Sequence, residues 1–184
     1  NGTHLEISST LKGKEVRGGK ATPLQTGIRV PLVANWTGTI PPGSVTSDLV
    51  DASDFYPTLA ELGETKISIE EGIDGISFVG TLLNRKGPRR ESCFFWYDPR
   101  PGWDKNLFSR HIFALDHKYK LFDDGRMFNI RGTQMREDEV DLNQLNGEAQ
   151  AAREKLRQTL DRTMRGPISP HARKLVDAYG NSLP

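Results

Sequence analysis

Residues 111–130 read HIFALDHKYKLFDDGRMFNI, three short apolar runs separated by polar connections. The runs span residues 111–115, 119–122 and 127–130. The connections, Asp116-His117-Lys118 and Asp123-Asp124-Gly125, have the length and composition of hairpin turns. The stretch therefore predicts three strands in antiparallel succession.

The flanking sequence extends this unit on both sides. Upstream, Ser92-Cys93-Phe94-Phe95-Trp96-Tyr97 is an aromatic run typical of a fourth strand. Downstream, apolar residues recur at steps of three and four, and Gly166-Pro167 ends the pattern. They are Ala149, Ala152, Leu156, Leu160 and Met164. Four antiparallel strands and one covering helix predict a small α+β unit at this end of the chain.

The first half of the chain is less regular. Residues 6–27 are rich in Gly, Lys, Ser and Thr and indicate a long irregular loop, whereas the apolar, β-branched residues 28–34 indicate a buried strand. Residues 51–62 predict a short amphipathic helix with Asp51, Ser53 and Asp54 as candidate caps, and Leu59 and Leu62 on one face. Shorter features are a turn at Pro41-Pro42-Gly43, a helix end at Gly63, a brief helix at 78–83 and a turn of helix around 174–178.

Bulk composition excludes several classes of protein. The 25 Lys and Arg residues balance 24 Asp and Glu, so the chain lacks the basic excess typical of nucleic-acid binding. No apolar run approaches the roughly 18 residues of a membrane-spanning helix. A single cysteine, Cys93, cannot form an internal disulfide or a multi-cysteine zinc site.

Individual reactive side chains have ordinary explanations. We interpret His4, His111, His117 and His171 as strand, turn or surface residues, and Asp123-Asp124 as turn residues rather than metal ligands. Cys93, inside an aromatic run, is interpreted as a small buried apolar residue. The basic stretches 12–17 and 85–90 are interpreted as solvated surface, with contact to an anionic polymer as the alternative for 85–90.

A series of short motifs carries more information. In chain order they are Gly18-Gly19-Lys20, Gln25-Thr26-Gly27-Ile28-Arg29-Val30-Pro31, Trp36 with Pro42-Gly43, Asp54-Phe55-Tyr56-Pro57-Thr58-Leu59, Asp74-Gly75-Ile76-Ser77-Phe78, and Tyr119-Lys120-Leu121 with Phe128-Asn129-Ile130. The series resembles the C-terminal part of type I, formylglycine-dependent sulfatases of the alkaline phosphatase-like superfamily. It covers about residues 1–164. The resemblance implies an α/β fold, with residues 1–88 from the catalytic α/β domain and residues 89–184 forming a C-terminal α+β subdomain.

The resemblance also implies site residues. Lys20 matches the family's lysine that contacts the substrate sulfate, and Asn1 matches a ligand of its calcium ion. An ammonium group suits an anionic ester that gains charge as it is cleaved. The family's nucleophile, formylglycine, arises from a Cys-x-Pro-x-Arg motif, whereas Cys93 is followed by Phe94-Phe95-Trp96. We therefore expect the nucleophile and most calcium ligands upstream of Asn1, and neither activity nor a tight calcium site in this chain alone.

The remaining expectations concern substrate, partners and compartment. The substrate implied by the resemblance is a sulfate ester, sulfated carbohydrates included, and the implied partner is the missing N-terminal part of the same protein. No nucleic acid or membrane partner is expected, and the family is commonly periplasmic, secreted or lysosomal. Two alternatives stay open: a phosphatase or phosphonate hydrolase of the same superfamily, and a non-catalytic binding module, for which an exposed apolar patch would be the sign.

Overall fold

The structure is a computed structural model that describes residues 2–67, 72–97, 111–132 and 135–165. Contacts divide the chain into two compact units: a first unit of Asn1–Val30 with Phe94–Pro184, and a second unit of Pro31–Cys93. The predicted boundary near residue 88 stays a prediction. Within the described residues no helix is both long and apolar enough to cross a bilayer.

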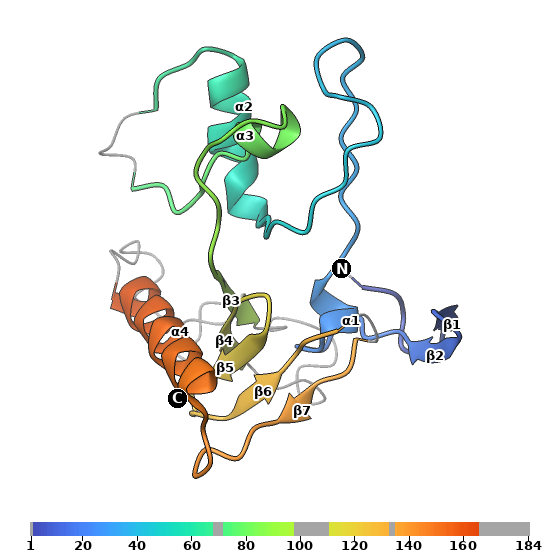
Figure 1. Cartoon of the computed structure of the whole chain (residues 1–184), viewed down its shortest axis with the longest axis vertical. Coiled ribbons are helices and arrows are strands. Elements are labelled where there is room, and N and C mark those ends of the chain that lie inside the picture. The colour runs from blue at the N-terminus through green and yellow to red at the C-terminus, as the bar shows by residue number, and fades with distance from the viewer. Residues whose placement is uncertain (1, 68–71, 98–110, 133–134, 166–184) are drawn as a thin grey trace, which may run out of the picture. The chain divides into compact units, whose positions relative to one another are not determined.

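The first unit is built on a five-stranded sheet in which strand order follows chain order (Figure 1). Its strands are β3 (Cys93–Tyr97), β4 (His111–Leu115), β5 (Tyr119–Phe122), β6 (Met127–Asn129) and β7 (Asp138–Glu139). Pairing from β4 to β7 is antiparallel, which confirms the predicted hairpins. Four strands were predicted; the fifth, β7, has two polar residues and therefore no apolar pattern by which to recognise it.

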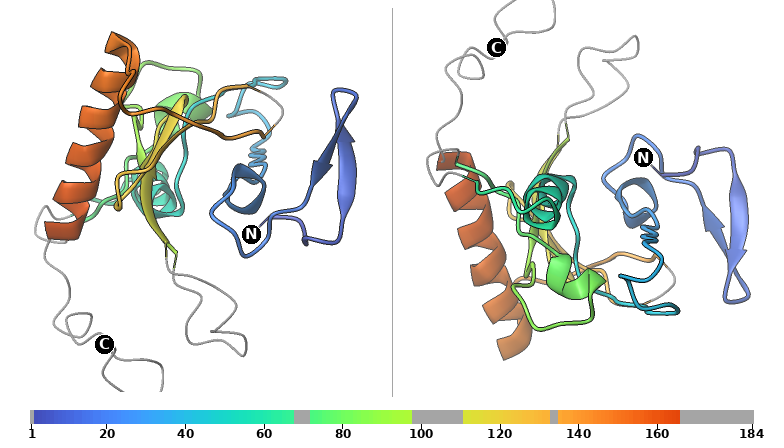
Figure 2. Two further views of the ribbon diagram at one scale, coloured as in Figure 1. Left: turned by 90° about the horizontal axis from the view of Figure 1, so that it is seen from below. Right: turned by 90° about the horizontal axis from the view of Figure 1, so that it is seen from above.

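One face of this sheet is covered by α4 (Gly147–Arg165), the predicted long helix (Figures 1 and 2). The helix begins where the Asn146 side chain accepts a hydrogen bond from the Ala149 amide, at 2.8 Å. Leu156 and Leu160 are almost fully buried against the sheet. The cluster they join comprises Ile112, Ala114, Tyr119, Leu121, Met127, Ala149 and Ala152. Side chains alternate along a strand, so the neighbours of these core residues face the other side.

The opposite face of the sheet is aromatic with one lysine at its centre. Phe95 stacks on Phe113, with ring centroids 4.8 Å apart, and Phe122 lies edge-on to Phe128. Lys120 is completely buried here. The short helix α1 (Gln25–Ile28) lies on this side, across the sheet from α4 (Figure 2).

The prediction of an irregular loop over residues 6–27 was wrong. Residues Ser8–Leu11 (β1) and Lys14–Arg17 (β2) form an antiparallel hairpin, and α1 follows. The hairpin turns at Lys12 and Gly13, both with positive φ, which matches the right-handed twist of a hairpin. The strands are mostly exposed on both faces, so no apolar alternation marked them in the sequence.

The predicted buried strand at residues 28–34 is not formed in this chain. Ile28 ends α1, and residues 29–34 have no regular secondary structure and are exposed. Val33 is 88% exposed. A strand requires partners for its backbone N–H and C=O groups, and no strand in the described part of the chain pairs with this segment.

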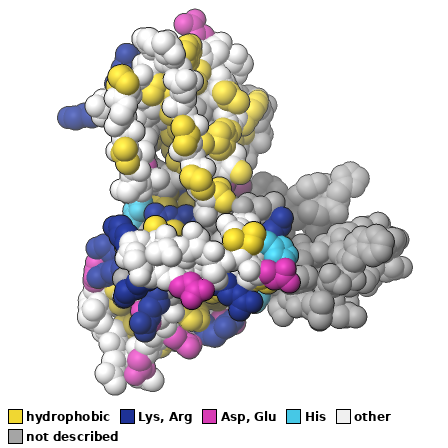
Figure 3. Space-filling view, turned by 90° about the vertical axis from the view of Figure 1, so that its right-hand side faces the viewer, with side chains coloured by type: hydrophobic (Ala, Val, Ile, Leu, Met, Phe, Trp, Pro, Cys, Tyr) yellow, Lys and Arg dark blue, Asp and Glu magenta, His cyan; other side chains and the backbone are white. Residues whose placement is uncertain are grey.

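The described residues of the second unit form three short helices: η1 (Ala52–Asp54), α2 (Phe55–Leu62) and α3 (Val79–Leu82). They confirm the predicted helices and the end at Gly63, and Pro57 lies in the first turn of α2. Of the three candidate caps, Asp51 is the N-cap of η1 and Asp54 completes its capping box. The expected turn at Pro42-Gly43 is present, with Gly43 at φ +72°. The predicted apolar face of α2 is only partly buried, however: Leu62 is half-buried, whereas Leu59 is 64% exposed. Figure 3 shows apolar side chains distributed over the surface of this unit.

Candidate functional site

Lys20, the predicted sulfate contact, follows the β1–β2 hairpin at the end of Gly18-Gly19. Its backbone amide donates to the carbonyl oxygen of Thr3, at 2.9 Å, and its side chain is exposed. The backbone of Lys20 is thus anchored while the ammonium group is open to solvent. This combination suits a residue that meets a ligand from outside.

Three glycines make the anchor possible. Gly2, Gly19 and Gly27 bring three backbone segments into direct contact, and the amide of Gly2 donates to the carbonyl of Gly27 at 2.9 Å. A Cβ on Gly2 would lie 1.9 Å from the carbonyl oxygen of Thr26, and one on Gly27 would lie 2.3 Å from the oxygen of Gly19. No side chain fits at such separations, so the glycines are required by packing. We call Gly2, Gly19 and Gly27 the glycine contact.

The turn after Lys20 is held by Thr22, whose hydroxyl donates to the carbonyl of Gly19 at 2.6 Å. The Thr22 amide donates to the same carbonyl at 3.0 Å. We call residues 18–28 the lysine loop. Its internal bonds fix the position of Lys20 relative to α1.

A buried ion pair ties the lysine loop to the sheet. The Lys120 ammonium donates to both carboxylate oxygens of Glu137, at 2.7 and 2.6 Å, and to the carbonyl of Pro23, at 2.7 Å. Glu137 also accepts from the amide of Gln25, at 2.7 Å. The Gln25 side chain in turn donates to the carbonyls of Ile130 and Arg136. We call Lys120, Glu137 and Gln25 the clasp.

Electrostatics of the clasp reflect its burial. The Lys120 side chain is fully buried and that of Glu137 is 7% exposed. Desolvation lowers the pKa of Lys120 below its usual range, and the hydrogen bonds and charge of Glu137 offset only part of that effect. The Lys120 ammonium also lies 5.2 Å from the centroid of the Phe113 ring. Sequence reasoning matched Lys120 to a family motif but gave it no role; a lysine inside an apolar strand was the available signal.

Asn1, the predicted calcium ligand, lies outside the described residues. Its neighbours Gly2 and Thr3 contact Gly27 and Lys20 through backbone hydrogen bonds. The start of the sequence and the predicted sulfate-contact lysine therefore come together in the fold, although 17 positions separate Thr3 from Lys20. Calcium takes six to eight oxygen ligands. Among the described residues no group of three or more His, Cys, Asp or Glu side chains could hold a metal ion, so the side chains described here do not by themselves form such a site.

The remaining sequence candidates have structural explanations. Cys93 is buried, and desolvation raises the pKa of its thiol to about 12, which confirms its interpretation as a buried apolar residue. His111 lies between the rings of Tyr97 and Phe122, and burial lowers the pKa of its imidazole. Asp124 and Gly125 form the β5–β6 turn, as expected, with Gly125 at φ +97°. His171 lies outside the described residues.

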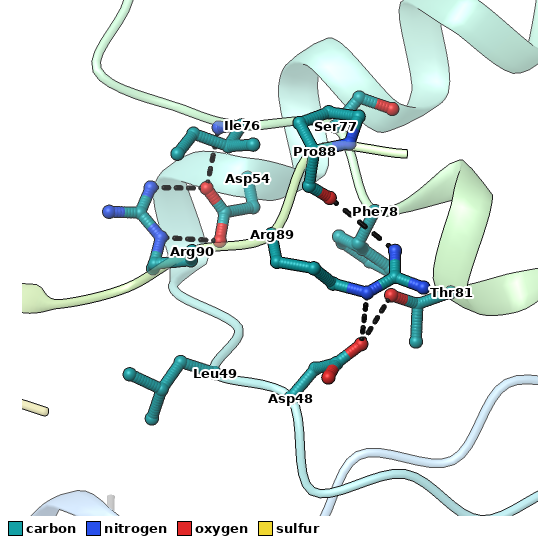
Figure 4. A pocket seen from close by; sticks show the side chains of 10 residues that line it. All are labelled: Asp48, Leu49, Asp54, Ile76, Ser77, Phe78, Thr81, Pro88, Arg89 and Arg90. Atoms are coloured by element: carbon teal, nitrogen blue, oxygen red, sulfur yellow. Dashed lines mark hydrogen bonds and ion pairs between the residues drawn. The ribbon is translucent and has the colours of Figure 1, made fainter. Parts of the chain in front are cut away.

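The basic stretch 85–90 was only partly interpreted correctly, because the side chain of its last residue, Arg90, is only 11% exposed. Arg90 forms a two-pronged ion pair with Asp54, whose side chain is 1% exposed (Figure 4). Beside it Arg89 pairs with Asp48 at 2.8 Å, and Thr81 donates to the same carboxylate. These residues line a shallow pocket of the second unit. Its charges satisfy one another, so the pocket has a structural role.

Comparison with known proteins identifies the family. A family model described as "N-sulphoglucosamine sulphohydrolase, C-terminal" matches residues 20–166. The chain belongs to this sulfatase family. The match covers the lysine loop from Lys20 onward, all of the second unit and all of α4, which confirms the resemblance read from the sequence motifs.

Curated relatives are sulfatases of greater length. An arylsulfatase of Hemicentrotus pulcherrimus is 36% identical over 80 residues, covering 44% of this chain and 14% of the relative. Human arylsulfatase A is 37% identical over 106 residues, covering 57% and 19%. An ulvan-active sulfatase of Formosa agariphila is 39% identical over 115 residues, covering 60% and 21%. The matched regions thus span about a fifth or less of the length of these relatives.

Proposed function

We propose that this chain is part of a sulfatase that hydrolyses a sulfate ester to an alcohol and sulfate. The observation that carries the proposal is the anchored, exposed Lys20 within a sequence of the sulfatase C-terminal family. Lys20 would contact the sulfate group and stabilise the charge that develops on its oxygens as the ester bond breaks. Sulfatases among the relatives, the ulvan-active sulfatase included, support a sulfated carbohydrate as substrate class.

The rest of the catalytic machinery is proposed to come from the remainder of the parent protein. The sequence contains no Cys-x-Pro-x-Arg motif from which formylglycine could arise. Calcium would likewise be held mostly by residues of that remainder, with Asn1 as one ligand. We therefore propose that this chain alone neither hydrolyses sulfate esters nor binds calcium tightly. The parent is proposed to act in the periplasm, a lysosome or the extracellular space, in keeping with sulfatase relatives such as arylsulfatase A.

The remainder of the parent is also the proposed partner of segment 29–34. The exposed side chains of Val30, Leu32 and Val33 would be covered when this segment pairs with a strand supplied by that remainder. Exposed apolar residues were the expected sign of a separate binding module. In a protein whose family members are parts of longer enzymes, the same observation fits an interface within one polypeptide, and we favour that explanation.

Assays of the parent test this proposal directly. The parent, the parent with Lys20→Ala and this chain alone would be incubated with p-nitrophenyl sulfate and with p-nitrophenyl phosphate. We expect the parent to prefer the sulfate ester, Lys20→Ala to lower kcat/KM by about 10²–10³-fold, the range for a lost transition-state contact, and this chain to be inactive. A parent that prefers phosphate would support the related phosphatase instead. Full activity in Lys20→Ala would remove the role assigned to this lysine.

A further inference from the structure

We infer that Lys120 is a positioning residue of the enzyme: through the clasp it fixes the lysine loop, and so Lys20, for contact with the substrate. The inference rests on the proposed function, because it takes Lys20 as the sulfate contact. Lys120 itself touches no substrate, since its ammonium is fully buried.

The contacts of Lys120 are directed at the lysine loop. Two of its three donors are used by Glu137, which passes the connection on to the Gln25 amide. A further contact reaches the Pro23 carbonyl, 97 positions away in the sequence. Proline has no amide to donate and residues 18–28 form no strand, so this segment cannot join the sheet by a ladder of backbone bonds. The clasp supplies polar contacts to the sheet in place of such a ladder.

The cost of the arrangement argues for a purpose beyond stability. Burying two opposite charges is expensive, and an apolar pair of similar volume often serves the fold as well or better. The surroundings of Lys120 include the rings of Phe113 and Phe122, which would accept an apolar side chain. A methionine could fill this space, but it could not hold the Pro23 carbonyl. Unlike an apolar pair, the ion pair therefore determines where the lysine loop lies.

Lys20 lies at the far end of the same rigid connection. The clasp holds Pro23 and Gln25, Thr22 links that segment to Gly19, and Gly19 precedes Lys20 directly. A displacement of about 1 Å in a catalytic group can cost on the order of 100-fold in rate. Loosening the clasp should therefore reduce catalysis without removing any group that contacts the ester.

The decisive variant is the double substitution Lys120→Met with Glu137→Leu. It removes both buried charges together, so neither is left unpaired and the sheet can stay folded. Lys120→Met alone would leave the Glu137 carboxylate buried without its partner. Unfolding of the sheet could then not be distinguished from loosening of the lysine loop. The matched control is Lys118→Met, two residues earlier in the chain, which breaks an exposed ion pair with Glu148 on the α4 side.

Amide hydrogen exchange in this chain can measure whether the lysine loop loosens. The informative amides are those whose hydrogen-bond acceptors are not changed by the double substitution. Lys20, Thr22 and Arg29 are such residues, since their amides bond to Thr3, Gly19 and Gln25. We expect the double variant to accelerate their exchange by about ten-fold or more, while amides in α4 change by less than about two-fold. Lys118→Met should leave all of them unchanged. Unchanged exchange at the three amides, or equal acceleration throughout the first unit, would overturn the inference.

Kinetics of the parent enzyme separate the inference from the proposed function. We expect the double variant to lower kcat/KM by at least about ten-fold, chiefly through kcat, with Lys118→Met unchanged. If Lys20→Ala lowers activity but the double variant does not, the positioning role is overturned and the proposed function stands. If the parent does not hydrolyse the sulfate ester, the proposed function fails; if Lys20→Ala retains full activity, only the role of Lys20 fails. In both cases the exchange comparison still decides whether the clasp fixes the loop.

Discussion

At the scale of single residues, Gly27 shows how closely backbone segments approach beneath Lys20. A Cβ at this position would lie 2.3 Å from the Gly19 carbonyl oxygen and 2.4 Å from that of Thr22, and backbone atoms cannot move aside as a side chain can. We expect Gly27→Ala to lower the free energy of unfolding by about 1–3 kcal/mol, the usual cost of overpacking. Urea denaturation followed by circular dichroism would measure it.

Gly147 provides the matched control for Gly27. It is also helical, at the start of α4, but nothing lies within 4 Å of the position its Cβ would take. Gly147→Ala should therefore be neutral or stabilise the chain by about 0.5–1 kcal/mol, because alanine has the higher helix propensity. Equal effects of the two substitutions would show that the glycine contact is looser than the structure indicates.

The buried pair of Asp54 and Arg90 makes a second prediction at this scale. Arg90→Met would leave the 1% exposed Asp54 carboxylate without its ion-pair partner. The expected loss in free energy of unfolding is about 3–5 kcal/mol. Arg89→Met, next to it in Figure 4, breaks a pair that is 39% and 29% exposed and should cost less than about 1 kcal/mol. Similar losses in the two variants would contradict a structural role specific to Arg90.

The same pair determines how acid affects the second unit. Burial by itself would raise the pKa of Asp54, but the hydrogen bond from Arg90, those from the Asp51 and Ile76 amides and the Arg90 charge outweigh burial, so the pKa is lowered. A carboxyl group with a lowered pKa in the folded state stabilises the fold fully above its unfolded pKa, about 3.9. That contribution is lost as the pH falls further, through the folded pKa. The fall in stability below about pH 4 should therefore be shallower in Arg90→Met.

At the scale of elements, α4 carries much of the first unit's core. Leu156 has no exposed surface and lies against the sheet. We expect Leu156→Ala to lower the free energy of unfolding by about 2–5 kcal/mol. Met164→Ala, on the same helix but 39% exposed, should cost under about 1 kcal/mol. Denaturant titration of both variants tests whether α4 is docked as the structure shows; comparable losses would contradict it.

The helices and strands differ in how far they could be predicted from the sequence. The strands β3 to β6 were predicted from short apolar or aromatic runs bounded by turn residues, and helix α4 was predicted from apolar residues at steps of three and four. Hairpin β1–β2 buries almost none, so only its Lys12-Gly13 turn could have indicated it. The family motif placed Lys20, but the clasp joins residues 97 positions apart, a distance over which a single sequence carries no pairing signal.

At the scale of the whole molecule, the exposed segment 29–34 is the surface proposed to meet the remainder of the parent. It includes Val33, which is 88% exposed although it lies within a run of apolar, β-branched residues typical of a buried strand. If the remainder of the parent covers Val33, a charge at this position should be tolerated in this chain and harmful in the parent. We expect Val33→Lys to change the stability of this chain by less than about 0.5 kcal/mol.

In the parent, Val33→Lys would place a charged side chain inside a sheet, away from water. The denaturation midpoint of the parent should therefore fall markedly, by an amount equivalent to several kcal/mol. Val33→Thr is the matched control: it keeps the β-branched shape without a charge, and its effect in the parent should be clearly smaller. Thermal and urea denaturation of both variants in both proteins would give the comparison. If Val33→Lys were equally harmless in the parent, segment 29–34 would stay exposed there, and a separate binding module would become the better explanation of its apolar residues.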